Sequence, residues 1–144
     1  GFAEEEENPM LAIERSISNY KKLGKNDEWI SKRLEGKLKR RKFTDCLQFH
    51  KVEAGGYGEC TNNIYRSLGE RNSTMILKSK GLQKGVTLRD HLDELELSIV
   101  EFTETLSAKT IEQENLIGND QCSQACKRTA TIVSNILQAH GHQM

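Results

Sequence analysis

The most constraining feature of the sequence is a regular apolar stripe between residues 87 and 106. Its members recur at alternating steps of four and three residues: Leu88, Leu92, Leu95, Ile99, Phe102 and Leu106. This spacing keeps side chains on one side of an α-helix. Thr87 precedes the stripe, and a threonine hydroxyl at that place can accept a backbone N–H of the first turn. We therefore predict a long central helix over about 87–115, with Leu95 and Ile99 facing the core.

The first fifty residues also show helical spacing. Pro9 fits the first position of a helix, and the apolar residues that follow predict a helix over 9–23. A second helical pattern, capped by Asp27, covers 28–50. Glycine lowers helix stability by about 1 kcal/mol, so we expect a break near Gly36.

Shorter helices are expected in the middle of the chain. Residues 55–58 contain three glycines and predict a loop, because glycine reaches positive φ easily. Thr61 is expected to cap a short helix. Asn72 or Ser73 is expected to start another, which ends near Gly81.

The last forty residues predict one further helix with a wide buried arc. Two apolar stripes run side by side from Cys122 to Leu137, and small residues at 125 and 130 would let another helix approach closely. This helix and the long central one are expected to form a C-terminal hairpin. The fold class is therefore all-α, an irregular multi-helix bundle. We expect a disordered acidic tail over 1–8, one helical domain over 9–140 and a flexible C-terminus over 141–144.

Composition excludes several classes of protein. One proline and few alternating β-branched residues argue against a β-sandwich or barrel. No run of about 18 apolar residues is present, so no segment is expected to span a membrane. The amino end is acidic and does not resemble a signal peptide. Because the first residue is Gly1 rather than methionine, we expect a piece of a longer protein or a tag remnant on a trimmed one.

The charge is zero in total but unevenly distributed. Residues 31–42 carry seven Lys or Arg against one Glu, and residues 87–116 carry eight Asp or Glu against two Lys or Arg. The basic run contains the candidate nucleic-acid-binding residues, which could hold phosphates: Lys37, Lys39, Arg40, Arg41 and Lys42. The alternative is a solvated helix face, since the run has no interleaved aromatic residues. Any nucleic-acid binding is expected to be weak and non-specific.

Four cysteines and several polar residues were considered as chemical sites. The cysteines are too sparse for a disulfide framework, which favours reduced thiols and a cytoplasmic location. Cys46 with His50, and Cys122 with Cys126, lie four residues apart and could supply zinc ligands, but buried core residues are the simpler interpretation. We expect neither a metal nor a cofactor.

The start of the long helix carries a candidate catalytic site. Arg89, Asp90, His91 and Glu94 crowd together there, and a histidine beside carboxylates can serve in acid–base chemistry. No serine or cysteine is placed as a nucleophile, and no glycine-rich phosphate loop precedes these residues. We therefore expect no enzyme activity.

Four short motifs, in order, resemble a known family. They are Arg41–Asp45, Thr61–Tyr65, Lys80–Lys84 and Leu88–Leu97. The resemblance that they carry extends over about residues 29–104, roughly half the chain. They resemble the helical domain of the DNA-damage-inducible protein D group and of Bro-type and KilA-type phage antirepressor proteins.

This resemblance implies a cytoplasmic, non-enzymatic regulatory module linked to phage biology or to the DNA-damage response. The motif residues that it marks for binding or structure are Asn62, Tyr65, Arg89, Asp90 and His91. The implied partner is another protein or a recombinase filament on single-stranded DNA, and oligomerisation is possible. The alternative function is a phage counter-defence or toxin-like effector that inhibits a host enzyme.

Overall fold

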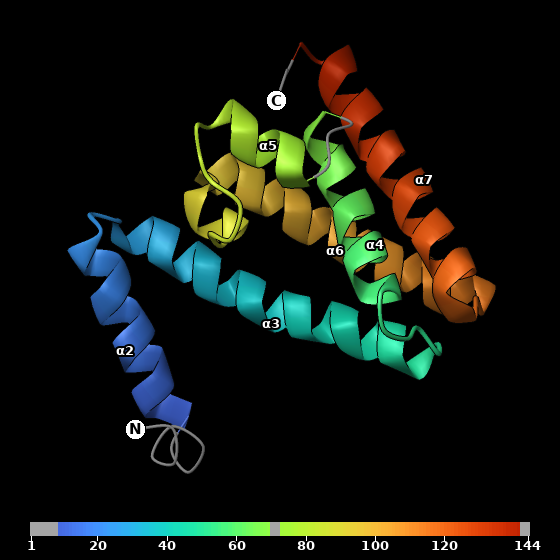
Figure 1. Ribbon diagram of the computed structural model, residues 1–144, viewed down its shortest axis with the longest axis horizontal. Coiled ribbons are helices and arrows are strands. Elements are labelled where there is room, and N and C mark those ends of the chain that lie inside the picture. The colour runs from blue at the N-terminus through green and yellow to red at the C-terminus, as the bar shows by residue number, and fades with distance from the viewer. Residues whose placement is uncertain (1–8, 70–72, 142–144) are drawn as a thin grey trace.

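The computed structural model describes residues 9–69 and 73–141, and every regular element in these ranges is a helix (Figure 1). In chain order the elements are α2 (Pro9–Lys22), α3 (Asp27–Phe49), α4 (Gly56–Tyr65), the 3₁₀ turn η1 (Arg66–Leu68), α5 (Ser73–Ser79), the 3₁₀ turn η2 (Leu88–His91), α6 (Glu94–Glu114) and α7 (Gly118–Ala139). The predicted all-α class is confirmed. The expected tail over 1–8, Asn72 and residues 142–144 lie outside the described residues.

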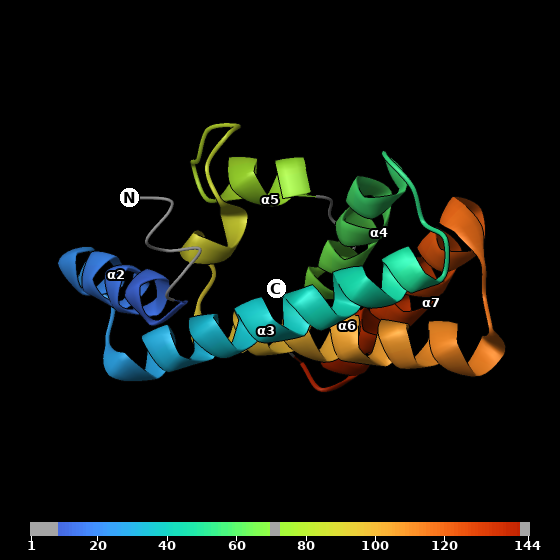
Figure 2. The ribbon, with the colours of Figure 1, turned by 90° about the horizontal axis from the view of Figure 1, so that it is seen from below.

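The helices are arranged around two principal contacts. α3 lies along α6, and α7 packs against α4 and η1, while α6 and α7 form the predicted C-terminal hairpin. α2 lies at one end of α3 in both views (Figures 1 and 2). It is fastened there by Tyr20, whose ring makes an edge-to-face contact with Trp29 at 5.1 Å between centroids.

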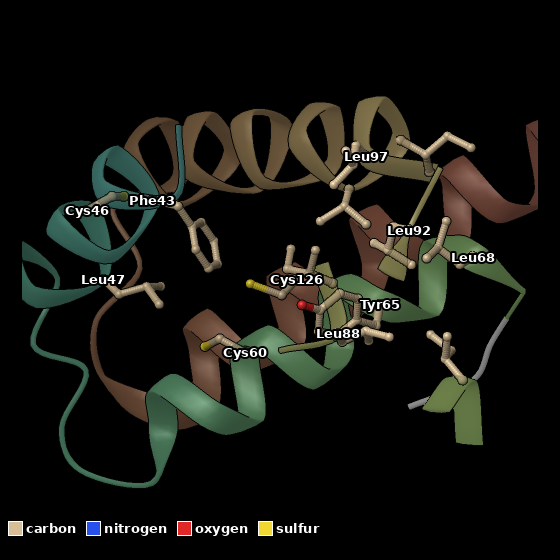
Figure 3. Close-up of a cluster of buried hydrophobic side chains, with 14 of the residues drawn as sticks. Phe43, Cys46, Leu47, Cys60, Tyr65, Leu68, Leu88, Leu92, Leu97 and Cys126 are labelled. Carbon is tan, nitrogen blue, oxygen red and sulfur yellow. The ribbon is translucent and has the colours of Figure 1, made fainter. Parts of the chain in front are cut away.

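The core fills the space enclosed by α3, α4, α6 and α7. Figure 3 shows side chains from these helices converging, among them Phe43, Cys60, Leu97 and Cys126. Ala125 and Ala130 are fully buried on α7, so the prediction of small residues at a helix contact is confirmed.

The break expected near Gly36 is wrong, because α3 runs without interruption from Asp27 to Phe49. Gly36 is buried against α6, and a Cβ atom added to it would lie 2.7 Å from Oε1 of Glu101. Glycine is thus present for close approach and not to end the helix. The helix is also capped one residue earlier than expected, since Oδ1 of Asn26 accepts the backbone N–H of Trp29 at 2.8 Å.

The long central helix begins seven residues later than predicted. Residues 88–91 form the 3₁₀ turn η2, and the Thr87 side chain makes no capping hydrogen bond. α6 starts after Asp93, whose side chain accepts the N–H of Glu96, while the Glu96 side chain accepts the N–H of Asp93. This reciprocal capping box is the sequence signal that the apolar stripe obscured.

The buried face of α6 also differs from the predicted stripe. Ile99 is buried, but Leu95, Phe102 and Leu106 are 51%, 53% and 36% exposed. The covered side carries a mixed set instead: Glu96, Leu97, Ile99, Val100, Glu101, Thr103, Glu104, Ser107 and Ile111. The prediction that Leu95 faces the core is wrong. Apolar spacing alone cannot identify buried carboxylates, which are tolerated only where other helices supply partners.

α5 begins at Ser73, one of the two expected starts, whereas α4 begins earlier than predicted. Residues 56–58 belong to α4, and Thr61 is inside that helix, where its hydroxyl donates to the Tyr57 carbonyl. Gly69 follows η1 at a φ of 111° and Gly81 follows α5 at 72°. Left-handed glycines therefore end these segments.

Candidate binding surfaces

The basic run at 31–42 does not form one cationic face. Successive residues turn by about 100° around a helix, so its cations are distributed around α3. Four of them contact carboxylates: Lys32, Arg33, Lys39 and Arg40 lie 2.6, 3.0, 3.3 and 3.1 Å from Glu101, Asp90, Glu35 and Glu104, respectively. The ammonium of Lys37 lies 5.4 Å from the centre of the Tyr20 ring, and burial lowers its pKa. Arg41 and Lys42 are exposed and form no ion pair within the described ranges.

Arg40 is partly exposed, and its guanidinium joins an ionic network around a buried carboxylate. Its Nη1 donates to Oε2 of Glu104, and its Nη2 donates to the Thr61 hydroxyl at 2.7 Å. Glu104 is fully buried and also receives two hydrogen bonds of 2.9 Å from Arg89. Burial alone would lower the pKa of Arg89, but the hydrogen bonds from its guanidinium to Glu104 raise it. One carboxylate thus fixes two arginines that belong to α3 and η2.

The five residues that the family resemblance marks fall into two groups in the structure, one with structural contacts and one on the surface. Arg89 donates to the Tyr65 hydroxyl at 3.0 Å inside the ionic network. Asp90 accepts hydrogen bonds from Tyr20 and Arg33 at 3.1 and 3.0 Å, and so fastens α2 and α3 to η2. These contacts explain three motif residues as structural.

Asn62 and His91 are the two motif residues on the surface. Asn62 accepts a hydrogen bond of 2.7 Å from the Ser73 hydroxyl, at the start of α5, and the His91 side chain is exposed. They do not lie in the buried ionic network with Arg89.

The cluster considered for catalysis is not assembled around one point. Arg89 points to the interior, Asp90 binds Tyr20 and Arg33, and His91 and Glu94 are exposed. Nothing in this arrangement places a base beside a nucleophile.

The thiols lie in the core and have ordinary partners. Burial raises the pKa values of Cys46 and Cys122 to about 11, and the interaction with the neighbouring Cys60 thiol raises the pKa of Cys126, a neighbour that the sequence did not indicate. His50 Nδ1 lies 2.7 Å from the Leu116 carbonyl oxygen. Among residues 9–69 and 73–141, no three His, Cys, Asp or Glu side chains are grouped as metal ligands.

The outward side of α3 carries exposed apolar side chains beside exposed cations. Leu38 and Phe49 are 63% and 80% exposed, and Lys42 lies on the line between them because the steps are four and seven residues. Arg41 flanks this line. We call these four residues the outer α3 face. It combines large apolar side chains with cations that have no ion-pair partner within the described ranges.

An open hollow lies beside the carboxyl end of this face. It has a volume of about 530 Å³ and reaches from Phe49 and Lys42 on α3 to Glu112 on α6. His50 and Cys46 also line it. The hollow therefore adjoins both the apolar and the cationic side chains of the outer α3 face.

No protein-family model matches the chain, and no curated protein sequence matches it. Within the described ranges, no helix has the length and apolar character needed to cross a bilayer.

Proposed function

We propose that this protein is a non-enzymatic regulatory binding module of a phage-related or DNA-damage-response protein, acting by contact with another protein or a nucleoprotein. The observation that carries the proposal is the outer α3 face. Exposed aromatic and arginine side chains on a rigid element are the residues that contribute most to protein interfaces. Ionic contacts join α3 to η2 and α6.

The chemistry of the face favours a partner with apolar and acidic groups. Leu38 and Phe49 would bury apolar area, and Arg41 and Lys42 would pair with carboxylates or phosphates. Pure nucleic acid is a poorer match, since Lys39 and Arg40 are ion-paired and, within the described ranges, only Lys37, Arg41 and Lys42 of the five expected cations form no ion pair. About three phosphate contacts give weak binding with a log–log salt slope near −3.

The family resemblance supplies the specific candidate, a recombinase filament on single-stranded DNA in the cytoplasm. Such a filament offers protein surface and phosphates together. The experiment compares binding of the labelled protein to single-stranded DNA, to recombinase and to the assembled filament by fluorescence anisotropy.

We expect the filament to bind best, with the double variants Leu38→Ser/Phe49→Ser and Arg41→Glu/Lys42→Glu each weakening binding by about tenfold or more. The control variant is Lys127→Glu, which changes an exposed cation on α7. Filament binding that the α3 variants leave unchanged would refute the role of this face. Equal binding to bare DNA would indicate direct nucleic-acid recognition. Absence of filament binding would favour the alternative function, an effector that inhibits a host enzyme.

A further inference from the structure

A second exposed apolar surface lies on α6, the helix that packs along α3. Leu95, Phe102 and Leu106 project from α6 on the side that α3, α4 and α7 leave uncovered. We call these three residues the outer α6 stripe. Three large apolar side chains on one uncovered helix face are more than scattered surface residues and mark an interaction site.

The residues at the two ends of the stripe carry opposite charges. Glu94 lies beside Leu95 at the amino end, and Lys109 lies at the carboxyl end. Both are exposed, and neither forms an ion pair within the described ranges. Phe102 is seven residues from Leu95 and seven from Lys109, which is about 10.5 Å along the helix in each direction. The stripe therefore has an apolar centre between ends of opposite charge.

This arrangement is self-complementary about Phe102. If a second α6 lies antiparallel with a twofold axis at Phe102, Leu95 of one copy is level with Lys109 of the other. The aliphatic part of that lysine can cover Leu95, and its ammonium can reach Glu94. A twofold axis produces this contact twice. A parallel arrangement would instead place Glu94 against Glu94 and Lys109 against Lys109.

We infer that the protein forms an antiparallel homodimer through the outer α6 stripe. The partner is a second copy of this chain, because the two charged ends of the stripe complement each other only in an antiparallel pair. The contact covers little more than four turns of one helix, so the dimer is small in area and forms reversibly. The outer α3 face lies on another helix, so the inference of a dimer does not rest on the proposed function.

Sedimentation velocity over a concentration series from about 5 to 300 µM tests the inference, a range suited to a small reversible interface. We expect the sedimentation coefficient to rise with concentration for the native chain. Phe102→Ser should remove the rise, while Ile132→Ser, which removes an exposed apolar side chain from α7, should not. Circular dichroism melts check that both variants fold.

Charge reversal separates a specific dimer from apolar association. Glu94→Lys and Lys109→Glu should each weaken the dimer by about tenfold, because each introduces two like-charge contacts. The double variant Glu94→Lys/Lys109→Glu should restore the native dissociation constant. A monomer throughout the concentration range, or a double variant as weak as the single ones, would overturn the inference.

Discussion

At the scale of single residues, the interior depends on a few charged side chains with exact partners. Glu101 is buried, and Oε2 lies 2.6 Å from the Lys32 ammonium, a contact that raises the pKa of Lys32. Neither Glu101 oxygen accepts a hydrogen bond within the described ranges, and Oε1 lies against Gly36. Gly36 and Glu101 therefore act together, one by its small size and the other by its charge.

Gly36→Ala should destabilise the protein by about 1–3 kcal/mol, although alanine favours helix formation. The new Cβ would force the Glu101 carboxylate away from Lys32. The matched control is Gly58→Ala in α4, which meets no atom within 4 Å and is expected to stabilise by about 0.5–1 kcal/mol. Urea unfolding of both variants measures the difference, and equal effects would contradict the role of Glu101.

Arg40 and its neighbour Arg41 should respond differently to substitution. The basic sequence run alone suggests that replacing either arginine leaves the stability of the protein unchanged. The structure indicates that Arg40→Gln costs about 1–3 kcal/mol, because Glu104 is buried and loses one of its two cations. Because the Arg41 side chain is exposed, Arg41→Gln should change the free energy of unfolding by less than about 0.5 kcal/mol. Thermal melts test this, and equal melting temperatures would refute the buried network.

At the scale of helices, α6 is the element whose orientation the sequence misrepresents. Its apolar residues form a regular stripe, and yet Leu95, Phe102 and Leu106 face outward. The inward side carries Glu96, Glu101 and Glu104, because cations from α3, η2 and the segment after α5 reach them. Such pairs depend on tertiary structure and leave no periodic signal.

Two leucines on α6 provide a direct test of this orientation. Leu97→Ala removes a buried side chain and should destabilise by about 2–5 kcal/mol. Leu95→Ala should cost less than about 1 kcal/mol in the monomer, because Leu95 is half exposed. Denaturant unfolding at low protein concentration avoids any contribution from dimerisation. If Leu95→Ala lowered the free energy of unfolding more than Leu97→Ala, the buried face of α6 would instead be the stripe predicted from the sequence.

At the scale of the whole molecule, local signals predicted the elements better than their faces. Pro9, Gly69 and Gly81 located helix ends because caps act through adjacent backbone. The all-α class and the C-terminal hairpin follow from periodicity. The inward turn of Arg40 could not be predicted, since it requires Glu104 from a segment 64 residues away. The outer α3 face was partly visible as charge, while its apolar members needed the structure.

The buried cysteines allow local opening of the structure to be measured by thiol modification. Cys60, Cys122 and Cys126 are fully buried, whereas Cys46 is slightly exposed and lines the hollow beside α3. A thiol-reactive reagent can modify the enclosed sulfurs only after α4 and α7 separate locally. Mass spectrometry counts the modified thiols on each chain. The time course therefore resolves whether the α4–α7 contact opens as one unit or unravels from an end, without any engineered probe.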